Sequence, residues 1–441
     1  MAGPSKARIQ TANSQRSGAL SKPSIAEITG GFLFTWEQEY LTIKVSRLHN
    51  HSSGKVTGEL LIQTTAPGYN PHLHRATFNF SDSEPRRRLA KQLAENYTEV
   101  DSENPLNGWK RILEQVCVYT LDNLRRGEPA CTITSEDKID QPRFLLDPII
   151  PLGHPTIIFG EGGAAKSYLA LLFAIATALP WEDNPLSLIP DTTRHKPFYL
   201  DWELSREAMT WRLKQLTLGH GLGYMEVGYR FCSLPLADDL DSIRDILAEA
   251  QTDFVIIDSL GLAAGGDLNS PESALRFFSA LRQLHITSLI VAHTSKDFTT
   301  SRKSVFGSVF FRNSARSIEE VKTIADGNKL NIGLFHDKAN LNERHPPIGI
   351  RLDFRGRESV KASSCEVNLI PELARGIPLK TRALALLKRG AMSSRELQEE
   401  LEIEKEKEDS FYAQLSTWKK KGWVLQLPNN TFCLPTTELE N

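Results

Sequence analysis

The stretch GEGGAAKSYLALLFAIATAL (Gly160–Leu179) decides the fold of this chain. Three of its first four residues are glycines, and Lys166 and Ser167 follow shortly after. A phosphate-binding loop needs backbone that approaches the phosphates closely, inward-pointing N–H groups, a lysine for the terminal phosphates and a hydroxyl for Mg²⁺. The residues predicted to surround a nucleotide are therefore Gly160, Glu161, Gly162, Gly163, Ala164, Ala165, Lys166, Ser167 and Tyr168.

The segments on either side of this loop support the same interpretation. The apolar run Thr156–Phe159 predicts a strand that leads in, and Tyr168–Leu179 predicts a helix that leads out. The dipole of such a helix places partial positive charge beside the phosphates. The alternative is a glycine-rich turn that only lets a helix pack on its strand, and the Lys-Ser pair favours the nucleotide site.

Ala165 stands where the usual pattern has its last glycine. A methyl group there costs little if the residue has right-handed helical angles, but roughly 1–2 kcal/mol if it is left-handed. We predict that Ala165 is right-handed. On this interpretation, a left-handed backbone at that position counts against nucleotide binding.

Short apolar segments alternate with amphipathic ones between Phe144 and Phe354. The apolar segments are rich in β-branched and aromatic residues, and the segments between them have helical spacing. This alternation predicts an α/β fold in which helices cover a mainly parallel sheet. The predicted strands are PTIIF, PFYLD, YRFCS, DFVIID and TSLIVAH.

Four regions follow from the pattern along the chain. We predict a flexible tail over residues 1–27 and a small α+β domain over 28–135, where strand-like runs precede helical ones. The α/β domain occupies residues 140–357. Residues 372–436 show three helical segments and a hairpin-like end, an order that resembles a winged helix, with SSRELQ as the capped start of its second helix.

The composition is that of a globular chain without overall attraction to nucleic acid. Of its 441 residues, 40% are hydrophobic and 24% are charged, and the net charge is −2. The longest strongly apolar run, Tyr168–Trp181, is shorter than the about 20 residues that a membrane-spanning helix needs. The basic, polar N-terminus and five cysteines without CxxC spacing indicate a cytoplasmic chain with reduced thiols and no membrane partner.

Asp258 ends the buried strand predicted in DFVIID. Ligands of open α/β sheets bind at the carboxyl ends of the strands, where an aspartate can hold the magnesium shell through water. The alternative role is a helix or turn cap, because Ser259 and Gly261 follow. The phosphate loop upstream favours the metal.

Two other predicted strands also end in polar residues. Asp201 and Glu203 follow one of them, and ATP hydrolysis needs a carboxylate that polarises the attacking water. Either residue fits that role, while the other caps the helix that begins near Ser205. The third strand ends with His293, and Lys296 follows. The histidine is placed to hydrogen-bond a terminal phosphate, or is simply a satisfied polar residue.

Five segments together resemble a known family, the RecA-like ATPases: GEGGAAKS, FYLDWELS, FVIIDS, IVAHTSK and GSVFFRNSAR. The nearest group is that of the hexameric plasmid replication helicases of the RepA type and their phage and bacterial relatives. The resemblance covers Leu145 to Phe354. It implies a RecA-like core, ATP as substrate and Mg²⁺ held by Ser167 and Asp258. Glu203 is then the catalytic base, with Lys166, His293 and Arg316 as further catalytic residues.

The resemblance also implies a ring of subunits, with six as the typical number, in which a neighbour supplies a basic finger to each site. Family members often carry a second finger in a Lys-x-Arg sequence on a late strand. This chain reads Lys338-Ala-Asn340 there. Arg316, Arg312 and Arg344 are the candidates to replace the missing arginine.

Residues 294–308 are a polar, basic segment at the place where RecA-like ring motors line their channel with loops. Arg302 and Lys303 are candidates to track phosphates of single-stranded DNA, and Phe306 or Phe298 to stack on bases. A solvated surface loop is the alternative. The glycine-rich segment 261–273 is the predicted companion loop.

The C-terminal region has two possible partners. Winged helices bind DNA or other proteins, and residues 372–436 hold eleven Lys and Arg against nine Asp and Glu. Lys419–Lys421 are the candidates for phosphate contacts.

Three functions are consistent with these observations. The first is an ATP-driven motor on single-stranded DNA, a replicative helicase of a mobile element or phage-like locus, with a primase or another replication protein as a candidate partner. The second is an ATP-gated loader or recombination mediator that does not unwind. The third is a nucleotide-sensing winged-helix regulator without turnover.

Overall fold

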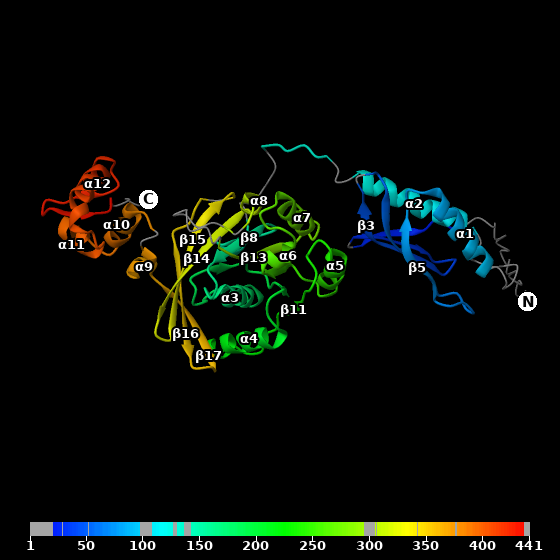
Figure 1. Cartoon of the computed structure of the whole chain (residues 1–441), viewed down its shortest axis with the longest axis horizontal. Coiled ribbons are helices and arrows are strands. Elements are labelled where there is room, and N and C mark those ends of the chain that lie inside the picture. The colour runs from blue at the N-terminus through cyan, green and yellow to red at the C-terminus, as the bar shows by residue number, and fades with distance from the viewer. Residues whose placement is uncertain are drawn as a thin grey trace, which may run out of the picture. The chain divides into compact units, whose positions relative to one another are not determined.

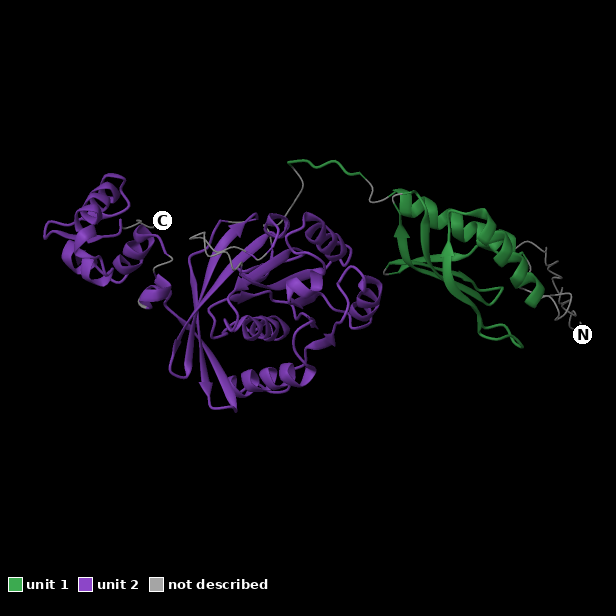
Figure 2. Cartoon of the chain, in the orientation of Figure 1, with its two compact units in different colours: residues 1–138 green, residues 139–441 purple. Residues whose placement is uncertain are grey.

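The computed structural model describes residues 21–28, 30–51, 53–97, 108–126, 130–135, 143–294, 305, 307–341, 343–374 and 377–435. The chain forms two compact units, residues 1–138 and residues 139–441 (Figure 2). Among the described residues, no helix is both long and apolar enough to cross a membrane.

In the first unit, five strands form one antiparallel sheet in chain order. Alternate residues of the inner strands point into one core, where Phe34, Ile43 and Leu60 are completely buried. Two helices close this core, as expected for an α+β unit. The elements are β1 (Ser24–Ile28), β2 (Gly31–Trp36), β3 (Leu41–Asn50), β4 (Val56–Thr64), β5 (His72–Asn79), α1 (Ser83–Tyr97) and α2 (Trp109–Arg126).

The strand β1 begins inside the segment predicted as a tail. It pairs antiparallel with β2, so that Ile25 lies opposite Phe34. Most of its side chains are exposed. An edge strand of this kind lacks the buried, alternating apolar residues on which the sequence prediction depends, and the boundary at residue 27 is therefore corrected to lie before Ser24.

Nine strands form the central sheet of the second unit, in the order β11-β10-β12-β13-β8-β14-β15-β16-β17. Neighbours are parallel from β11 to β14 and antiparallel from β14 to β17. The predicted α/β fold with a mainly parallel sheet is confirmed. The strands are β8 (Pro155–Gly160), β10 (Pro197–Asp201), β11 (Gly228–Phe231), β12 (Phe254–Asp258), β13 (Thr287–His293), β14 (Ser317–Asp326), β15 (Lys329–Ala339), β16 (Ile348–Arg355) and β17 (Ser359–Cys365).

Helices cover both faces of this sheet (Figure 1). One apolar core contains α3 and α4, and the other contains α5, α6, α7 and α8. The segment 261–273, predicted as a loop, in fact holds most of α6 and the first turn of α7. The helices are α3 (Lys166–Ala178), α4 (Arg206–His220), α5 (Leu240–Glu249), α6 (Leu260–Ala264), α7 (Pro271–Arg282) and α8 (Val309–Ser314).

The central sheet continues past residue 357, the predicted end of the α/β domain. Its last strand, β17, pairs with β16 and lies beside α4 (Figure 1). There the Ala362 N–H donates to His220 Nε2 at 2.9 Å. Three serines and a lysine occupy β17, so its sequence shows little of the apolar alternation that predicts strands. The chain continues into η1 (Val367–Leu369) and α9 (Pro371–Ala374).

Residues 377–435 form three α-helices, one short 3-10 helix and three short strands around a separate hydrophobic core. The three α-helices and the final hairpin follow one another as predicted, while β18, between the first two helices, was not predicted. The strands pair as β18-β20-β19. Ser393 caps α11 in a capping box with Glu396. The elements are α10 (Leu379–Leu387), β18 (Met392–Ser393), α11 (Ser394–Glu400), η2 (Lys405–Lys407), α12 (Glu408–Lys420), β19 (Leu425–Gln426) and β20 (Thr431–Cys433).

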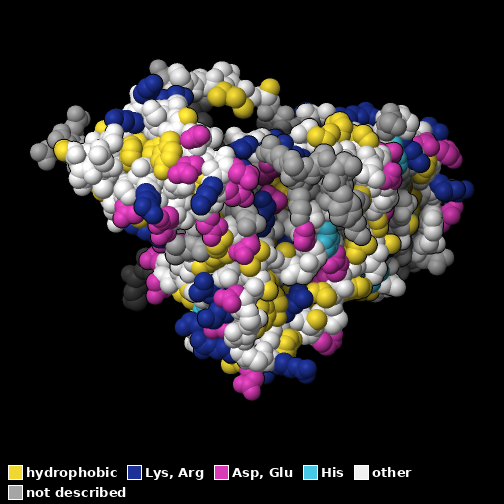
Figure 3. All heavy atoms as spheres, turned by 60° about the vertical axis from the view of Figure 1, so that its left-hand side comes forward, with side chains coloured by type: hydrophobic (Ala, Val, Ile, Leu, Met, Phe, Trp, Pro, Cys, Tyr) yellow, Lys and Arg dark blue, Asp and Glu magenta, His cyan; other side chains and the backbone are white. Residues whose placement is uncertain are grey.

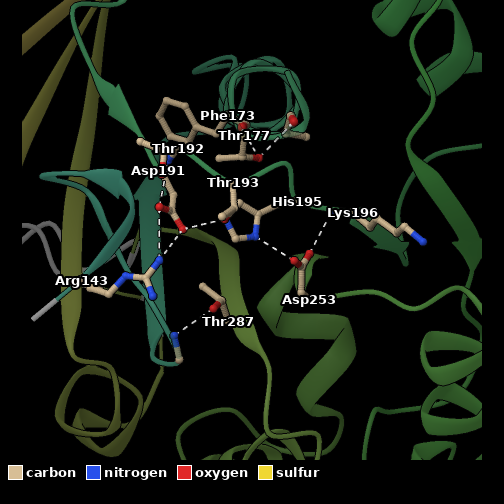
Figure 4. A network of polar contacts seen from close by, with 12 residues as sticks. Arg143, Phe173, Thr177, Asp191, Thr192, Thr193, His195, Lys196, Asp253 and Thr287 are labelled. Carbon is tan, nitrogen blue, oxygen red and sulfur yellow. Dashed lines mark hydrogen bonds and ion pairs between the residues drawn. The ribbon is translucent and has the colours of Figure 1, made fainter. Parts of the chain in front are cut away.

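A buried histidine joins the segments that lead into β10 and β12 (Figure 4). His195 Nδ1 lies 2.7 Å from Asp253 Oδ2, and its Nε2 lies 3.1 Å from Asp191 Oδ2. Arg143 also contacts Asp191, at 3.0 Å. This network ties the central sheet to the small sheet of β6 (Phe144–Asp147), β7 (Ile150–Pro151) and β9 (Ile189–Pro190).

Replacing His195 with glutamine is expected to destabilise the protein by about 2–3 kcal/mol at pH 6, because two carboxylates lose a buried partner. Burial alone lowers the pKa of His195, but the hydrogen bonds and charges of Asp253 and Asp191 outweigh it and raise the pKa above 6.5. Stability from a raised pKa is fully present below pH 6.5 and is lost as the pH rises through the folded-state pKa.

Urea unfolding of the wild type and the His195→Gln variant between pH 6 and pH 9 measures this effect. The difference in unfolding free energy between them should shrink as the pH rises. The exposed His72, replaced in the same way, is the control and should leave stability within about 0.5 kcal/mol. A difference that does not vary with pH would contradict the protonated bridge.

Candidate nucleotide-binding site

The loop between β8 and α3 lies at the carboxyl end of the parallel strands, where α/β sheets bind ligands. Gly160 ends β8 directly beside β14. A Cβ atom at Gly160 would lie only 2.6 Å from the Val321 carbonyl oxygen, so the approach of the two strands requires glycine. Gly163 has a φ of 78°, a conformation that glycine adopts without strain.

Ala165 is left-handed, with φ 53° and ψ 24°, so the predicted right-handed conformation is wrong. The helix begins one residue later, at Lys166, and Ala165 is its N-cap. Left-handed residues at 163 and 165, with a residue of negative φ between them, form the alternating backbone that turns successive N–H groups toward one point. Such a nest binds anions. The left-handed backbone therefore favours phosphate binding, contrary to the criterion taken from sequence.

Replacing Ala165 with glycine is expected to raise the free energy of unfolding by about 0.5–1 kcal/mol. The substitution relieves a left-handed alanine, and the larger backbone entropy of glycine in the unfolded chain offsets part of the gain. Urea unfolding measures the change. Ala164→Gly is the matched control: its backbone is not left-handed, so it should destabilise the protein. A stability that falls equally in both variants would contradict strain at Ala165.

Lys166 is buried, and its ammonium group is held by the loop itself. Nζ donates to the carbonyl oxygens of Gly160 at 2.9 Å and Glu161 at 2.7 Å. Burial lowers the pKa of Lys166, and the negative charges of Asp258, Glu203 and Glu161 oppose this shift. The positive charge therefore lies against the loop that the sequence assigns to the phosphates.

Ser167 and Asp258 are brought together from α3 and β12. Ser167 Oγ donates to Asp258 Oδ2 at 2.7 Å, and the Tyr199 hydroxyl donates to the same oxygen at 2.5 Å. Burial raises the pKa of Asp258, while the hydrogen bonds from Tyr199 and Ser167 lower it in part. A hydroxyl beside a carboxylate is the donor set that P-loop ATPases use for Mg²⁺. These two residues fit the metal, and the capping role weighed for Asp258 is not the one observed.

The structure separates the roles of Asp201 and Glu203. Asp201 is buried, and its Oδ1 accepts the backbone N–H groups of Glu203 and Leu204, both at 2.9 Å. It therefore holds the turn, while Ser205 caps α4. Glu203 is partly exposed, with Oε1 3.3 Å from His293 Nε2. Of the two carboxylates, only that of Glu203 lines the cavity between the phosphate loop and β13.

The phosphate loop, Asp258, Glu203 and His293 line one cavity of about 270 Å³. Arg212 lies over the ring of Tyr168, 5.1 Å from its centroid, and Phe354 packs edge-on against the same ring. The cavity is lined by Gly163, Ala164, Ala165, Lys166, Ser167, Tyr168, Glu203, Leu204, Arg212, Asp258, Val291, His293, Leu330 and Phe354.

Sequence reasoning missed several residues of this site. Tyr199 was identifiable, because strand alternation places it on the same face as Asp201, two residues away. Ser259, whose hydroxyl donates to Glu203 Oε1, was considered only as a sign of a cap. No pattern in the sequence distinguishes Arg212 on α4 or Phe354 on β16.

Arg316 lies outside this cavity. It is exposed and directly precedes β14. Its backbone N–H donates to the Pro155 carbonyl, at the opposite end of β8 from the phosphate loop. Lys338 donates to three carbonyl oxygens, those of Arg312, Asn313 and Ala315, at 2.8–3.0 Å. Phe298, Arg302, Lys303 and Phe306, predicted near DNA, and Lys296, which follows His293, lie outside the described residues.

Residues 126–298 match a family model described as an AAA domain. The matched segment contains the phosphate loop, Glu203, Asp258 and His293. P-loop ATPase domains use ATP with Mg²⁺. A KaiC-like protein from the hyperthermophilic archaeon Pyrococcus horikoshii has a similar solved structure, with 13% sequence identity and a TM-score of 0.35, over 53% of this chain and 99% of that chain. No curated protein matches the chain.

Proposed function

We propose that this chain is an ATP-driven, ring-forming motor that acts on single-stranded DNA, as replicative helicases of mobile elements and phage-like loci do. The observation that carries the proposal is the contact between Glu203 and His293. His293 ends β13, and residues 294–308, the predicted DNA loop, begin directly after it. One hydrogen bond thus connects the hydrolytic carboxylate to the segment proposed to hold DNA.

The chemistry follows from the positions of the side chains. Lys166 offsets negative charge on the terminal phosphates, and Ser167 and Asp258 would hold Mg²⁺, which adds further positive charge when bound. Glu203 orients the attacking water and accepts its proton. His293 donates to the terminal phosphate before hydrolysis and to Glu203 afterwards. This exchange of partners changes the position from which the segment after β13 begins.

Ring formation would complete each site. Arg316 is exposed at the end of the sheet that lies away from its own cavity. An arginine in this position could act as the basic finger in the nucleotide site of a neighbouring subunit. We propose a hexamer on the basis of the family resemblance. The C-terminal residues 377–435 would contact DNA or a replication protein such as a primase. Residues 372–436 hold eleven Lys and Arg against nine Asp and Glu, a balance that favours a protein contact there. Figure 3 shows Lys and Arg interspersed with Asp and Glu on the face of the molecule that it draws.

The test is ATP turnover of the purified protein with and without single-stranded DNA, together with displacement of a labelled strand from a forked duplex. We expect single strands to stimulate turnover at least about tenfold and unwinding to require ATP. Turnover that single strands do not change would overturn the motor and leave the nucleotide site in place.

A second candidate is an ATP-gated loader or recombination mediator, and the position of Lys338 favours it. Its ammonium group is satisfied by three carbonyls, so it is not available as a finger in the present conformation. Stable, ATP-dependent complexes on DNA without strand displacement would support this candidate over the motor.

A further inference from the structure

Three side chains outside the nucleotide site converge between β14, β15 and the segment after β15. Glu319 lies opposite His336 in the register of the two strands, and His345 comes from the following segment. Glu319 Oε1 is 2.9 Å from His345 Nε2 and 3.7 Å from His336 Nε2. The three side chains are almost fully buried, with exposed fractions of 0%, 1% and 8% for Glu319, His336 and His345.

The second oxygen of Glu319 has no hydrogen-bond partner among the described residues, although it is buried. A buried carboxylate oxygen without a partner is costly, and native proteins normally satisfy it with a donor, water or an ion. This oxygen is therefore an independent sign that the cluster binds something.

The outer partner of the His345 ring suits metal ligation. His345 Nδ1 lies 2.7 Å from the Pro346 carbonyl oxygen, which leaves Nε2 with the lone pair. A carbonyl partner of this kind fixes the orientation of metal-bound histidines in proteins. His336 Nε2 lies 3.4 Å from the Ser317 hydroxyl, and its Nδ1 accepts the His345 N–H at 3.3 Å. The contact at Nδ1 must break when Nε2 binds a metal, because Nδ1 then carries the proton.

We propose that Glu319, His336 and His345 bind one divalent transition-metal ion, with Zn²⁺ as the best match. Two imidazoles and one carboxylate are a zinc donor set, whereas Mg²⁺ and Ca²⁺ prefer oxygen ligands only. Bonds of about 2.0–2.1 Å in a tetrahedral site place donor atoms roughly 3.3 Å apart. The two distances on Glu319 Oε1 bracket this value, and all three donor atoms lie within 4.8 Å of one another.

The cluster around His195 shows what a histidine–carboxylate bridge without a metal looks like. There the two carboxylates contact opposite nitrogens of one ring, so no single point is close to all three groups (Figure 4). In the proposed site, two imidazoles meet the same oxygen. The competing explanation, a charged His345 paired with Glu319 and no metal, leaves the second oxygen of Glu319 unexplained.

The ion would stabilise the pairing of β14 and β15 near the arginine proposed to serve a neighbouring subunit. Glu319 lies on β14, which begins directly after Arg316, and His336 lies on β15, which also carries Lys338. A metal bound here would fix the spacing of these strands and of the segment that carries His345. The metal site itself does not depend on the proposed motor function. Only the importance of the metal for the position of Arg316 rests on that function.

The test is the metal content of the full-length protein, purified with a tag that contains no histidine and measured by mass spectrometry. We expect about one Zn²⁺ per chain, and a chelator should lower the Tm by at least about 5 °C. Glu319→Gln and His345→Gln should each reduce zinc content at least tenfold, while His195→Gln keeps it. Asp258→Asn, tested alongside, should also keep its zinc. Only zinc bound in the nucleotide site, rather than at Glu319, would be lost in that variant.

Cobalt binding to the wild type decides the case if these variants do not fold. Co²⁺ added to chelator-treated wild type should give the visible absorption of a tetrahedral nitrogen–oxygen site, which Zn²⁺ displaces. Purified wild type that holds no metal, and shows neither this absorption nor a higher Tm with Zn²⁺, would overturn the proposal.

Discussion

Replacing Lys166 with alanine is expected to lower kcat for ATP hydrolysis by about 100-fold to 1,000-fold. The ammonium group is the positive charge fixed at the inner side of the phosphate loop, and removal of one such preorganised group costs about this factor in other enzymes. Steady-state phosphate release at saturating ATP measures the loss. ATP affinity should fall as well, because the same charge binds the ground state.

Lys214→Ala is the matched control. This lysine lies on α4, outside the cavity, and its side chain is exposed, so its removal should leave kcat within about twofold of the wild type. Both variants should keep the circular dichroism spectrum of the folded protein. Full turnover by Lys166→Ala would show that the loop does not bind ATP.

The phosphate loop was predictable from sequence because its determinants are local. Three glycines, a lysine and a serine stand within eight residues between a strand and a helix, and each acts through its own backbone or side chain. The handedness of Ala165 was not predictable. It depends on where the helix begins, and the sequence places that start only to within a residue or two.

The assignment of Glu203 needed long-range structure. Tyr229, on β11, donates to Asp201 Oδ2 at 3.2 Å, and the turn amides occupy the other oxygen. Both oxygens of Asp201 thus accept hydrogen bonds within the fold, yet nothing within FYLDWELS reveals these partners. The resemblance to RecA-like ATPases predicts Glu203 as the base, and Glu203 is the carboxylate that lines the cavity, while spacing alone left the choice open.

The Glu319 cluster shows the same limit more clearly. Glu319 and His336 meet because β14 and β15 pair in one register, and His345 returns to them from beyond the strand. No spacing typical of a metal site links the three positions, so only the fold brings them together. The edge strands β1 and β17 escaped prediction for another reason: their sequences lack alternating apolar residues.

Replacing Glu203 with glutamine is expected to lower kcat by about 100-fold to 10,000-fold, the range for loss of a general base. Binding of ATP should change by less than about threefold, because the phosphate loop and the Ser167–Asp258 pair are untouched. Phosphate release gives the turnover, and a fluorescent ATP analogue gives the affinity. The variant should therefore hold ATP without hydrolysing it.

Asp201→Asn separates this effect from damage to the turn. An asparagine keeps an acceptor for the two turn amides but not the charge, so we expect a loss of about 1–2 kcal/mol in stability and a kcat within about tenfold of the wild type. The pair of variants tests the assignment in both directions. If Asp201→Asn abolished turnover in a folded protein while Glu203→Gln kept it, the base would be Asp201, and the contact between Glu203 and His293 could no longer couple hydrolysis to the segment after β13.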